Sequence, residues 1–368
     1  MRIATIATRF STGGAQLNSL LVANELAARG HRTQSWFLMR AGELDVPAGL
    51  EVKIASESPS QGAINSVRCM LETRKFTSQF EPDVIIGFHP LANIIGASCA
   101  YAQRHCHFIG TQRNPSSSQG RVTGLLERLL GSTSLYAANV AVTSAVCESY
   151  SAYPHSYRNK LRVIHNGTPD LAPLVASKAQ ARASIGLPAG VRLVGTLGRL
   201  AEQKNPLFLL DVCRNLPDVH LAFAGSGPLR ESLLGTAEAY GMSGRVHLTG
   251  ELRGEHITSF YKSIDAFLLP SLFEGFGRTL VEAMSLGVPV VAHALPVTHE
   301  VVGDAGFLLP LTPELWSAAI NELASSPTLT EKYSLSGTSR ADLFTVRKMI
   351  DGYEKICMDS LAGQARHT

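Results

Sequence analysis

The stretch DAFLLPSLFEGFGRTLVEAMSLGVPVV, residues 265–291, decides the fold of this chain. Ala266–Leu269 is a short apolar run closed by a proline, which predicts a buried strand that opens into a loop. The loop SLFEGFG contains two glycines, which allow a backbone to approach a ligand closely. Apolar periodicity then predicts a helix over Arg278–Leu286, and Val288–Ala292 reads as a second buried strand. The stretch therefore predicts a strand, a glycine loop, a helix and another strand.

Such a unit places the free N–H groups of a helix start at the carboxyl end of a parallel sheet, where phosphate-bearing ligands bind. Two carboxylates frame it, Glu274 in the loop and Glu282 in the first turns of the helix. Carboxylates repel a phosphate unless they face hydroxyl groups, so one could hold sugar hydroxyls and the other ribose hydroxyls. Alternatively, Glu274 lies on the surface and Glu282 is a favourable helix N-terminal charge. The spacing alone leaves both interpretations open.

Size and composition indicate a globular protein of two domains. The chain has 368 residues, of which 45% are hydrophobic and 17% charged. No apolar run is long enough to span a membrane, and the N-terminal MRIATIATRF does not resemble a secretory signal. The six cysteines are scattered without a CxxC pair, as expected for buried thiols in a reducing compartment. We therefore expect a cytoplasmic protein.

The charge is distributed unevenly along the chain. Residues 1–180 carry 17 Lys/Arg and 11 Asp/Glu, although the net charge of the whole chain is only +3. A basic first half favours an anionic partner such as a lipid diphosphate or the cytoplasmic face of the inner membrane. No basic run interleaved with aromatic residues occurs, so we expect no nucleic acid partner.

The first half begins as a nucleotide-binding fold would, with a predicted strand Arg2–Ala7 and a predicted helix from about Ala15 to Arg29. Gly13 and Gly14 precede this helix, but GxGxxG is absent. No acidic residue ends the next predicted strand, Thr33–Leu38, so a nicotinamide or flavin enzyme is disfavoured. The two glycines either make the turn or let a phosphate or substrate approach the backbone.

Further along, the predicted strand Val84–Phe88 ends directly at His89. A lone histidine is more often structural than functional, so its residue type leaves both roles open. Gln112–Gly120 is polar and turn-rich, which predicts a mobile loop. Its Arg113 is either a surface charge or a contact to an anionic acceptor. The amphipathic segment Val122–Leu130 is either membrane-facing or packed on the core, and we expect core packing.

The second half restarts the alternation of strands and helices, which predicts a second α/β domain. After its first strand comes GRLAEQKNP, in which Arg199 and Lys204 lie five residues apart. Two cations close to a helix start suit a diphosphate, although a solvated basic loop is the alternative. Four loops of this half should meet at one edge of the sheet: 198–206, 225–228, 250–253 and 270–279.

The motifs GRLAEQKNP, AGSGP and PSLFEGFGRTLVEAMSLGVPVV together resemble the C-terminal domain of the family-four retaining glycosyltransferases. The glycine pair, His89 and Asn166-Gly167 occur in the order that this family shows. Arg113-Asn114-Pro115 is similar to a branch that builds bacterial surface polysaccharides and lipopolysaccharide, although Gln112 stands where that branch often has Glu. The resemblance implies an α/β fold of two Rossmann-like, doubly wound domains facing across a cleft, the GT-B fold.

The resemblance also implies domain roles. Residues 1–170 would bind the acceptor and residues 171–348 the nucleotide-sugar, with a C-terminal helix of about 349–368 packed back on the first domain. The implied catalytic residues are His89, Arg199, Lys204 and Glu274. The implied donor-binding residues are Gly14, Gly225, Gly227, Leu252, Gly275, Phe276, Gly277, Arg278, Thr279, Leu280 and Glu282. The implied acceptor-binding residues are Arg113 and Asn114.

The expected reaction is transfer of a glycosyl unit, namely a hexosyl group, with retention of its anomeric configuration. Arg199, Lys204 and the helix start would stabilise the departing diphosphate, so no metal and no cofactor are expected, and no Asp-x-Asp occurs in the chain. A UDP-sugar is the preferred donor and a saccharide or lipid-diphosphate-linked saccharide the expected acceptor. The alternatives are a sugar-nucleotide epimerase of the same two-domain build and a non-catalytic nucleotide-sugar-binding protein.

Overall fold

The computed structural model describes residues 1–11, 13–60, 62–103, 105–171 and 176–362. Internal contacts divide the chain into two compact units. Unit 1 comprises Met1–Gly167 together with Val346–Thr368, and unit 2 comprises Thr168–Thr345. The chain therefore leaves unit 1, completes unit 2 and returns.

Unit 1 is built on a parallel sheet of seven strands in the order β3-β2-β1-β4-β5-β6-β7. These strands are β1 (Arg2–Phe10), β2 (Arg32–Arg40), β3 (Glu51–Ile54), β4 (Val84–Phe88), β5 (His107–Gln112), β6 (Ala138–Ala141) and β7 (Leu161–Val163). Its helices are α1 (Gly14–Ala28), α2 (Ala63–Phe80), α3 (Pro90–Tyr101), η1 (Ser116–Ser118), α4 (Arg121–Gly131), α5 (Ser144–Ser149), α6 (His155–Arg158) and α15 (Val346–Ala362).

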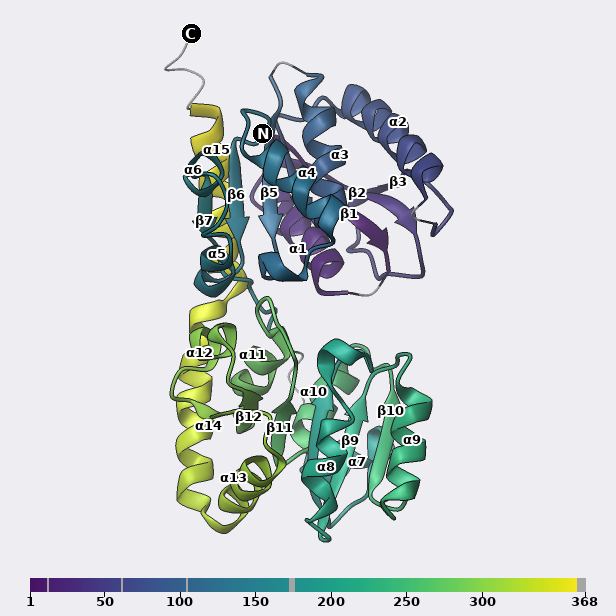
Figure 1. Cartoon of the computed structure of the whole chain (residues 1–368), viewed down its shortest axis with the longest axis vertical. Helices are drawn as coiled ribbons and strands as arrows, with labels where there is room; N and C mark the ends of the chain where they lie inside the picture. The colour runs from purple at the N-terminus through teal and green to yellow at the C-terminus, as the bar shows by residue number, and fades with distance from the viewer. Residues whose placement is uncertain (12, 61, 104, 172–175, 363–368) are drawn as a thin grey trace. The chain divides into compact units, whose positions relative to one another are not determined.

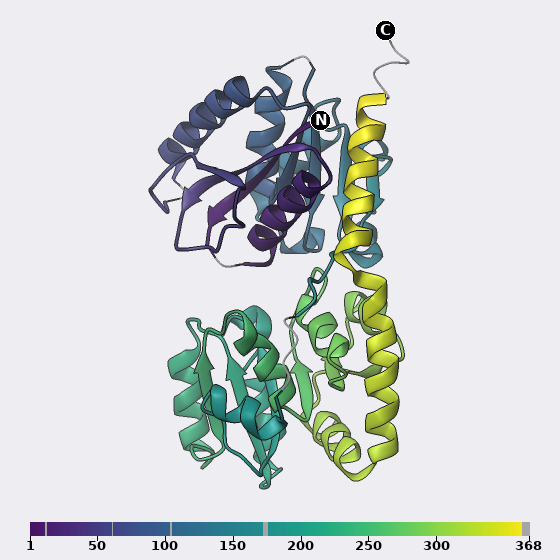
Figure 2. The same cartoon turned by 180° about the vertical axis from the view of Figure 1, so that it is seen from behind.

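Helices cover both faces of this sheet. α2, α3 and α4 form one layer, visible in Figure 1, with α3 between the other two. α1 and α15 lie side by side on the opposite face, as Figure 2 shows. Arg29, the residue that follows α1, donates hydrogen bonds to Asp351 and Glu354 of α15, each at 2.6 Å. Apolar side chains of α15, among them Ile350 and Ile356, complete the core on that face.

Unit 2 is built on a parallel sheet of six strands in the order β10-β9-β8-β11-β12-β13. The strands are β8 (Arg192–Leu197), β9 (Val219–Ala224), β10 (Val246–Gly250), β11 (Ala266–Leu269), β12 (Val290–His293) and β13 (Gly306–Leu309). The helices are α7 (Lys178–Ser184), η2 (Glu202–Lys204), α8 (Phe208–Arg214), α9 (Arg230–Ala239), α10 (Glu255–Ser263), α11 (Arg278–Ser285), α12 (Pro296–Val302), α13 (Pro313–Ser325), α14 (Pro327–Ala341) and η3 (Asp342–Phe344). Two parallel, doubly wound sheets confirm the predicted fold class.

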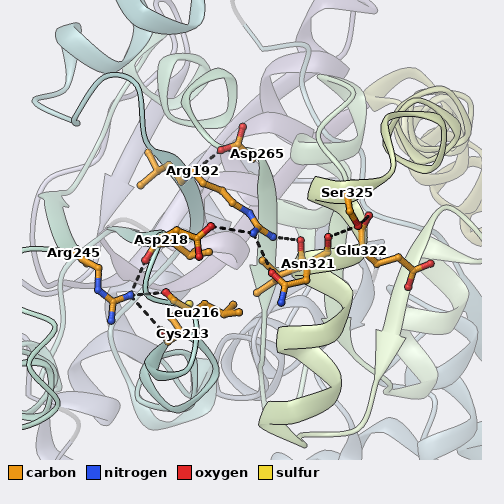
Figure 3. Close-up of polar contacts among 12 residues, drawn as sticks. Arg192, Cys213, Leu216, Asp218, Arg245, Asp265, Asn321, Glu322 and Ser325 are labelled. Atoms are coloured by element: carbon orange, nitrogen blue, oxygen red, sulfur yellow. Dashed lines mark hydrogen bonds and ion pairs between the residues drawn. The ribbon is translucent and has the colours of Figure 1, made fainter.

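Polar side chains tie together the amino ends of the unit 2 strands (Figure 3). Arg192, at the start of β8, donates to Asn321 of α13 at 3.0 Å and pairs with Asp218 at 3.5 Å. Arg245, just before β10, donates to the carbonyls of Leu216 and Val219 at 2.7 and 2.9 Å. The contacts of Arg245 satisfy main-chain carbonyls at the edge opposite to the carboxyl ends of the strands.

Several local predictions need correction. The first strand continues to Phe10, beyond the predicted end at Ala7, because its pairing with β2 extends that far. The helix that the sequence placed on the core, Val122–Leu130, turns most of its apolar side chains outward: Leu130 packs against the core and Glu127 is buried, but the remaining apolar residues of α4 are exposed, namely Val122, Leu125, Leu126 and Leu129. The prediction of core packing is therefore wrong for those side chains. Part of the expected linker after Asn166-Gly167 lies outside the described residues.

None of the helices in the described ranges is long and apolar enough to cross a membrane.

Candidate functional site

The carboxyl ends of β8 and β11 lie side by side in unit 2, because these strands are neighbours in the sheet. β8 is the first strand of the unit, and the order of strands reverses between it and β11. In open α/β sheets, ligands bind at such a reversal, beyond the carboxyl ends of the strands. The loop with Arg199 and Lys204 and the loop with Glu274 therefore meet at the place where this fold binds ligands.

Lys204 and Glu274 form a direct pair across these two loops. The Lys204 Nζ atom lies 2.5 Å from Glu274 Oε1, and the side chains are 24% and 8% exposed. Gln203 joins the same loops, because its carbonyl accepts from the Leu272 N–H at 2.8 Å and its side chain donates to the Phe273 carbonyl at 3.1 Å. The Glu274 carboxylate is thus buried, neutralised by a cation and fixed in place.

Glu282 is also buried and paired. Arg278 Nε donates to Glu282 Oε1 at 2.7 Å, and the Tyr261 hydroxyl donates to Glu282 Oε2 at 2.7 Å. The Tyr261 ring, on α10, is fully buried, and burial followed by the charge of Glu282 raises the pKa of its hydroxyl well above the ordinary value. Tyr261 therefore stays protonated and donates. Because a carboxylate has about four lone-pair positions, Glu282 keeps acceptor capacity for further hydroxyl groups.

The start of α11 provides polar groups next to these carboxylates. Gly277 caps the helix with a φ of 81°, a left-handed conformation that favours glycine. The Leu280 N–H donates to the Gly277 carbonyl at 2.9 Å, so this predicted phosphate-binding N–H already has a partner. Arg278 and Thr279 come first in the helix, where N–H groups have no intrahelical partner. The Thr279 hydroxyl is buried, and it has no hydrogen-bond partner among the residues that the structure describes.

The Phe276 side chain belongs to the core of unit 2, with its ring edge-on to Phe344 at 5.3 Å. Gly275, beside it, is buried in the same loop. Any donor contact from these two residues would therefore come from their backbone.

Two further predicted donor-binding glycines have a packing reason of their own. A Cβ atom on Gly225 would lie 2.0 Å from the Gly198 carbonyl oxygen, and one on Gly227 would lie 2.3 Å from that of Leu200. Glycine is therefore required at both positions for the loop after β9 to pack on the loop after β8. Leu252 is half-buried just beyond β10, in the segment predicted to hold the base.

Arg199 is exposed at the end of β8. It has no ion-pair partner among the residues that the structure describes, unlike Lys204. The site in unit 2 thus offers one exposed cation, two cations that are each paired with a carboxylate, and a helix start.

Unit 1 has its own group of polar residues at the carboxyl ends of its strands. His89 follows β4 and is the N-cap residue that precedes α3, with φ 151° and ψ 150°, a backbone region that residues other than glycine rarely occupy. His89 is exposed as a residue, while desolvation of its imidazole, then the positive charges of Arg113 and Arg9, lower the pKa of that group. His89 is therefore neutral at pH 7, held by a strained backbone at the edge of the sheet.

Gly14 is the first residue of α1 and is exposed. A Cβ atom there would meet nothing within 4 Å, and the residue does not have a positive φ. Neither the turn nor the packing of unit 1 therefore requires glycine at position 14, whereas a Cβ atom on Gly13 would lie 2.5 Å from Gln16 Oε1.

Arg113 is not the surface charge that one alternative predicted. Its side chain is half-buried, donates to Asn166 Oδ1 at 2.7 Å and lies over the Phe88 ring at 5.5 Å. Asn114 is half-buried next to it, and its carbonyl accepts from the Tyr150 hydroxyl at 3.4 Å. Both residues are thus built into the carboxyl edge of the unit 1 sheet.

Gln112 is buried and faces another carboxylate. Its side-chain N–H donates to Glu127 at 2.6 Å, and its oxygen accepts from Tyr150 at 3.0 Å. A glutamate here would place two buried carboxylates in contact, which explains the glutamine. Further along, Gln119 donates to Tyr150 at 2.7 Å, so the segment that we predicted as a mobile loop is anchored by hydrogen bonds.

Sequence reasoning missed Gln203 and Tyr261. Gln203 lies inside the motif GRLAEQKNP, yet its role of joining two loops depends on partners 70 residues away. Tyr261 gives no local signal, since it sits in an ordinary helical pattern. Within the described ranges, no group of three or more His, Cys, Asp or Glu side chains is placed to hold a metal ion.

Two family models match the chain. One, described as Glycosyltransferase Family 4, matches residues 12–170, and the other, described as Glycosyl transferases group 1, matches residues 177–340. The two matches together cover most of unit 1 and unit 2.

Curated relatives are also similar. The D-inositol 3-phosphate glycosyltransferase of Segniliparus rotundus is 30% identical over 261 residues, which are 67% of this chain and 58% of that protein. The O-antigen biosynthesis glycosyltransferase WclY of Escherichia coli is 24% identical over 307 residues, 82% of each chain. The chain spans only about half the length of the first curated relatives that it matches.

Among solved structures, Anabaena HepE in complex with UDP and glucose has a TM-score of 0.83 and 19% sequence identity to this chain. The alignment covers 96% of this chain and 98% of HepE, which shows a shared fold. With both family models matched in order along the chain, the protein belongs to the family-four glycosyltransferases of GT-B fold.

Proposed function

We propose that this protein is a retaining glycosyltransferase that moves a sugar from a nucleotide-sugar, preferably a UDP-sugar, to a saccharide or lipid-linked saccharide. Unit 2 would bind the donor and unit 1 the acceptor. The names of similar proteins support this choice: HepE was solved with UDP and glucose, and WclY is named for O-antigen biosynthesis.

One observation carries the proposal: both carboxylates at the carboxyl edge of unit 2 are neutralised by cations. Free carboxylates would repel a diphosphate, but Glu274 is paired with Lys204 and Glu282 with Arg278. The paired carboxylates can accept hydrogen bonds from hydroxyl groups without exposing net negative charge. Glu274 would hold hydroxyls of the donor sugar and Glu282 those of the ribose.

The diphosphate would then lie against positive groups. When the glycosidic bond breaks, positive charge develops on the sugar and negative charge on the departing diphosphate. Arg199, Lys204 and the first N–H groups of α11 would stabilise that negative charge. Because these groups supply the positive charge, the proposed reaction needs no metal ion. The acceptor hydroxyl would attack on the face that the diphosphate leaves, which retains the configuration, and the diphosphate could take its proton.

The acceptor would meet the carboxyl edge of unit 1. Arg113 and Asn114 lie there with the strained, neutral His89. His89 would act beside the donor sugar, and the diphosphate would approach the backbone of Gly14. The six cysteines are all unpaired, which supports action in a reducing compartment.

The proposal is tested first by binding. A panel of UDP- and GDP-sugars is scored by thermal shift of the full chain, since a ligand that binds the native state raises its apparent stability. A UDP-sugar should give the largest shift. No shift with any sugar nucleotide would contradict donor binding.

Turnover is then measured as release of nucleoside diphosphate with candidate saccharide acceptors. Release that requires an acceptor identifies a transferase, whereas an epimerase converts the donor without one and a binding protein does neither. Arg199→Ala should lower kcat by about 100-fold or more, as expected when one charge-stabilising group is lost. Lys332→Ala, on exposed α14, serves as the control and should keep full activity. Equal kinetics for both variants would refute the role of Arg199.

A further inference from the structure

The apolar face of α4 points away from unit 1. Four of its five large apolar residues are widely exposed, Val122 72%, Leu125 57%, Leu126 40% and Leu129 56%, whereas Leu130 packs against the core. At about 3.6 residues per turn the four exposed positions form a single stripe along the helix. A surface helix of a soluble domain normally buries such a stripe against the core, whereas in α4 the stripe is exposed.

Hydrogen bonds to the opposite face fix this orientation. Glu127 is the charged residue of α4 that is buried, with no exposed surface. Its carboxylate accepts from Gln112 at 2.6 Å, from the Tyr136 hydroxyl at 2.7 Å and from the Tyr157 hydroxyl at 3.3 Å. Rotating α4 to bury its leucines would pull Glu127 out of these bonds and leave the buried donors unpaired, which is costly. The exposed stripe is therefore built in rather than incidental.

Positive charge flanks the stripe. Arg121 and Arg128 are exposed and lie along one side of the stripe, each about one helical turn from Leu125. Arg128 also extends over the Tyr153 ring at 5.7 Å, which holds it near the surface. A helix with an apolar stripe and flanking arginines fits the boundary between the headgroups and acyl chains of an anionic bilayer.

A second stripe lies in the same layer of helices. On α2, Ile64, Val67 and Leu71 are exposed at helical spacing, next to the exposed Arg68 and Arg74. α2 and α4 flank α3 on one face of the unit 1 sheet (Figure 1). Two stripes with the same chemistry thus occur on the outer side of one layer.

We propose that the outer face of α4, supported by that of α2, binds the surface of a lipid bilayer with anionic headgroups. A second copy of the chain is the competing occupant. The exposed patch on α4 is of the order of a few hundred Å². A standard protein interface buries roughly 800 Å² per partner. Insertion into a bilayer needs no such minimum, and the arginines match anionic lipid rather than the same arginines of a second copy. This binding is independent of the proposed sugar transfer.

The test is co-sedimentation of the full chain with vesicles of phosphatidylcholine alone or mixed equally with phosphatidylglycerol. The wild type should sediment with the anionic vesicles, and far less with the neutral ones. Binding should weaken at about 1 M salt, where the Debye length is about 3 Å. Leu125→Gln/Leu129→Gln should lower the partition coefficient by roughly tenfold or more, because each leucine loses its apolar contact. Arg121→Gln/Arg128→Gln should remove the preference for anionic vesicles.

Leu335→Gln is the matched control, since Leu335 is 65% exposed on α14 of unit 2. It should bind as the wild type does. All substituted side chains are exposed, so each variant should keep its Tm, which is measured alongside. Wild-type protein that stays in the supernatant with anionic vesicles overturns the proposal, as does equal binding of the double leucine variant. The face would belong to a second copy of the chain under a different pair of results. The wild type would form a dimer in analytical ultracentrifugation without binding vesicles, and the double leucine variant would be a monomer.

Discussion

The pairing of Lys204 with Glu274 predicts a specific loss of stability in Lys204→Met. This change leaves the Glu274 carboxylate, 8% exposed, without its cation. Removing one partner of a charged, buried hydrogen bond costs about 1.5–3 kcal/mol. Because Lys204 itself is 24% exposed, water can partly replace it. We therefore expect a loss of about 2 kcal/mol in the free energy of unfolding of unit 2.

Scanning calorimetry of the full chain measures this loss. The chain contains two compact units, so its unfolding need not be a single transition. The transition of unit 2 is identified as the one that a bound UDP-sugar moves to higher temperature. For a unit of this size, 1 kcal/mol corresponds to about 2–4 °C, so the Tm of that transition should fall by about 4–8 °C.

The double variant Lys204→Met/Glu274→Gln separates the pair from the loss of either side chain. The neutral amide no longer needs a cation, so most of the lost stability should return, while turnover stays low because both groups are absent. If the single and double variants unfold at the same temperature, the two side chains are not coupled. That result would refute the reasoning that Lys204 neutralises Glu274.

The remaining predictions concern unit 1. In Gly14→Ala the Tm should stay unchanged, since a Cβ atom there meets nothing within 4 Å, while the donor KM rises by roughly tenfold if a diphosphate approaches this backbone. Burial raises the pKa of Glu127 in the folded state, so the free energy of unfolding of unit 1 should fall as the pH rises from 4.5 through this raised pKa. Glu127→Gln should abolish this contribution to the pH dependence, which calorimetry at a series of pH values measures. Gln112→Glu adds a second carboxyl and should cost more than about 1 kcal/mol at pH 7, with recovery toward pH 4.5. The pKa of His89 is lowered, so the acidic limb of the kcat profile should lie below pH 6.5; Arg113→Gln removes a positive charge and should move that limb upward.

Local signals in the sequence were sufficient for the unit at residues 265–291. β11 spans Ala266–Leu269 as predicted, and α11 begins at Arg278 as predicted. An apolar run closed by Pro270 and a glycine at a positive φ define these boundaries without help from distant residues. The second strand begins two residues later than predicted, at Val290, because Pro289 precedes it.

The electrostatic state of the site could not be predicted from the sequence. Spacing showed two carboxylates but not their partners, since Glu274 meets a lysine 70 residues away and Glu282 meets Tyr261, 21 residues away. The same limit applies to Gly225, whose closest neighbour would be the Gly198 carbonyl. Such contacts depend on which strands become neighbours in the sheet.

The orientation of α4 was predicted wrongly for a related reason. Hydrophobic periodicity identifies a face but not what lies against it. The buried side of α4 is set by Glu127 and its partners Tyr136 and Tyr157, which come from later parts of the chain. A polar network can thus outweigh an apolar stripe when the network is fully buried.

The most direct test of donor binding by unit 2 is a crystal structure with a bound UDP-sugar. The diphosphate is predicted at the start of α11, beside Arg199 and Lys204, with sugar hydroxyls on Glu274 and ribose hydroxyls on Glu282. A nucleotide-sugar found at any other edge of the unit, with Lys204 and Arg278 still bonded only to their carboxylates, would contradict the account.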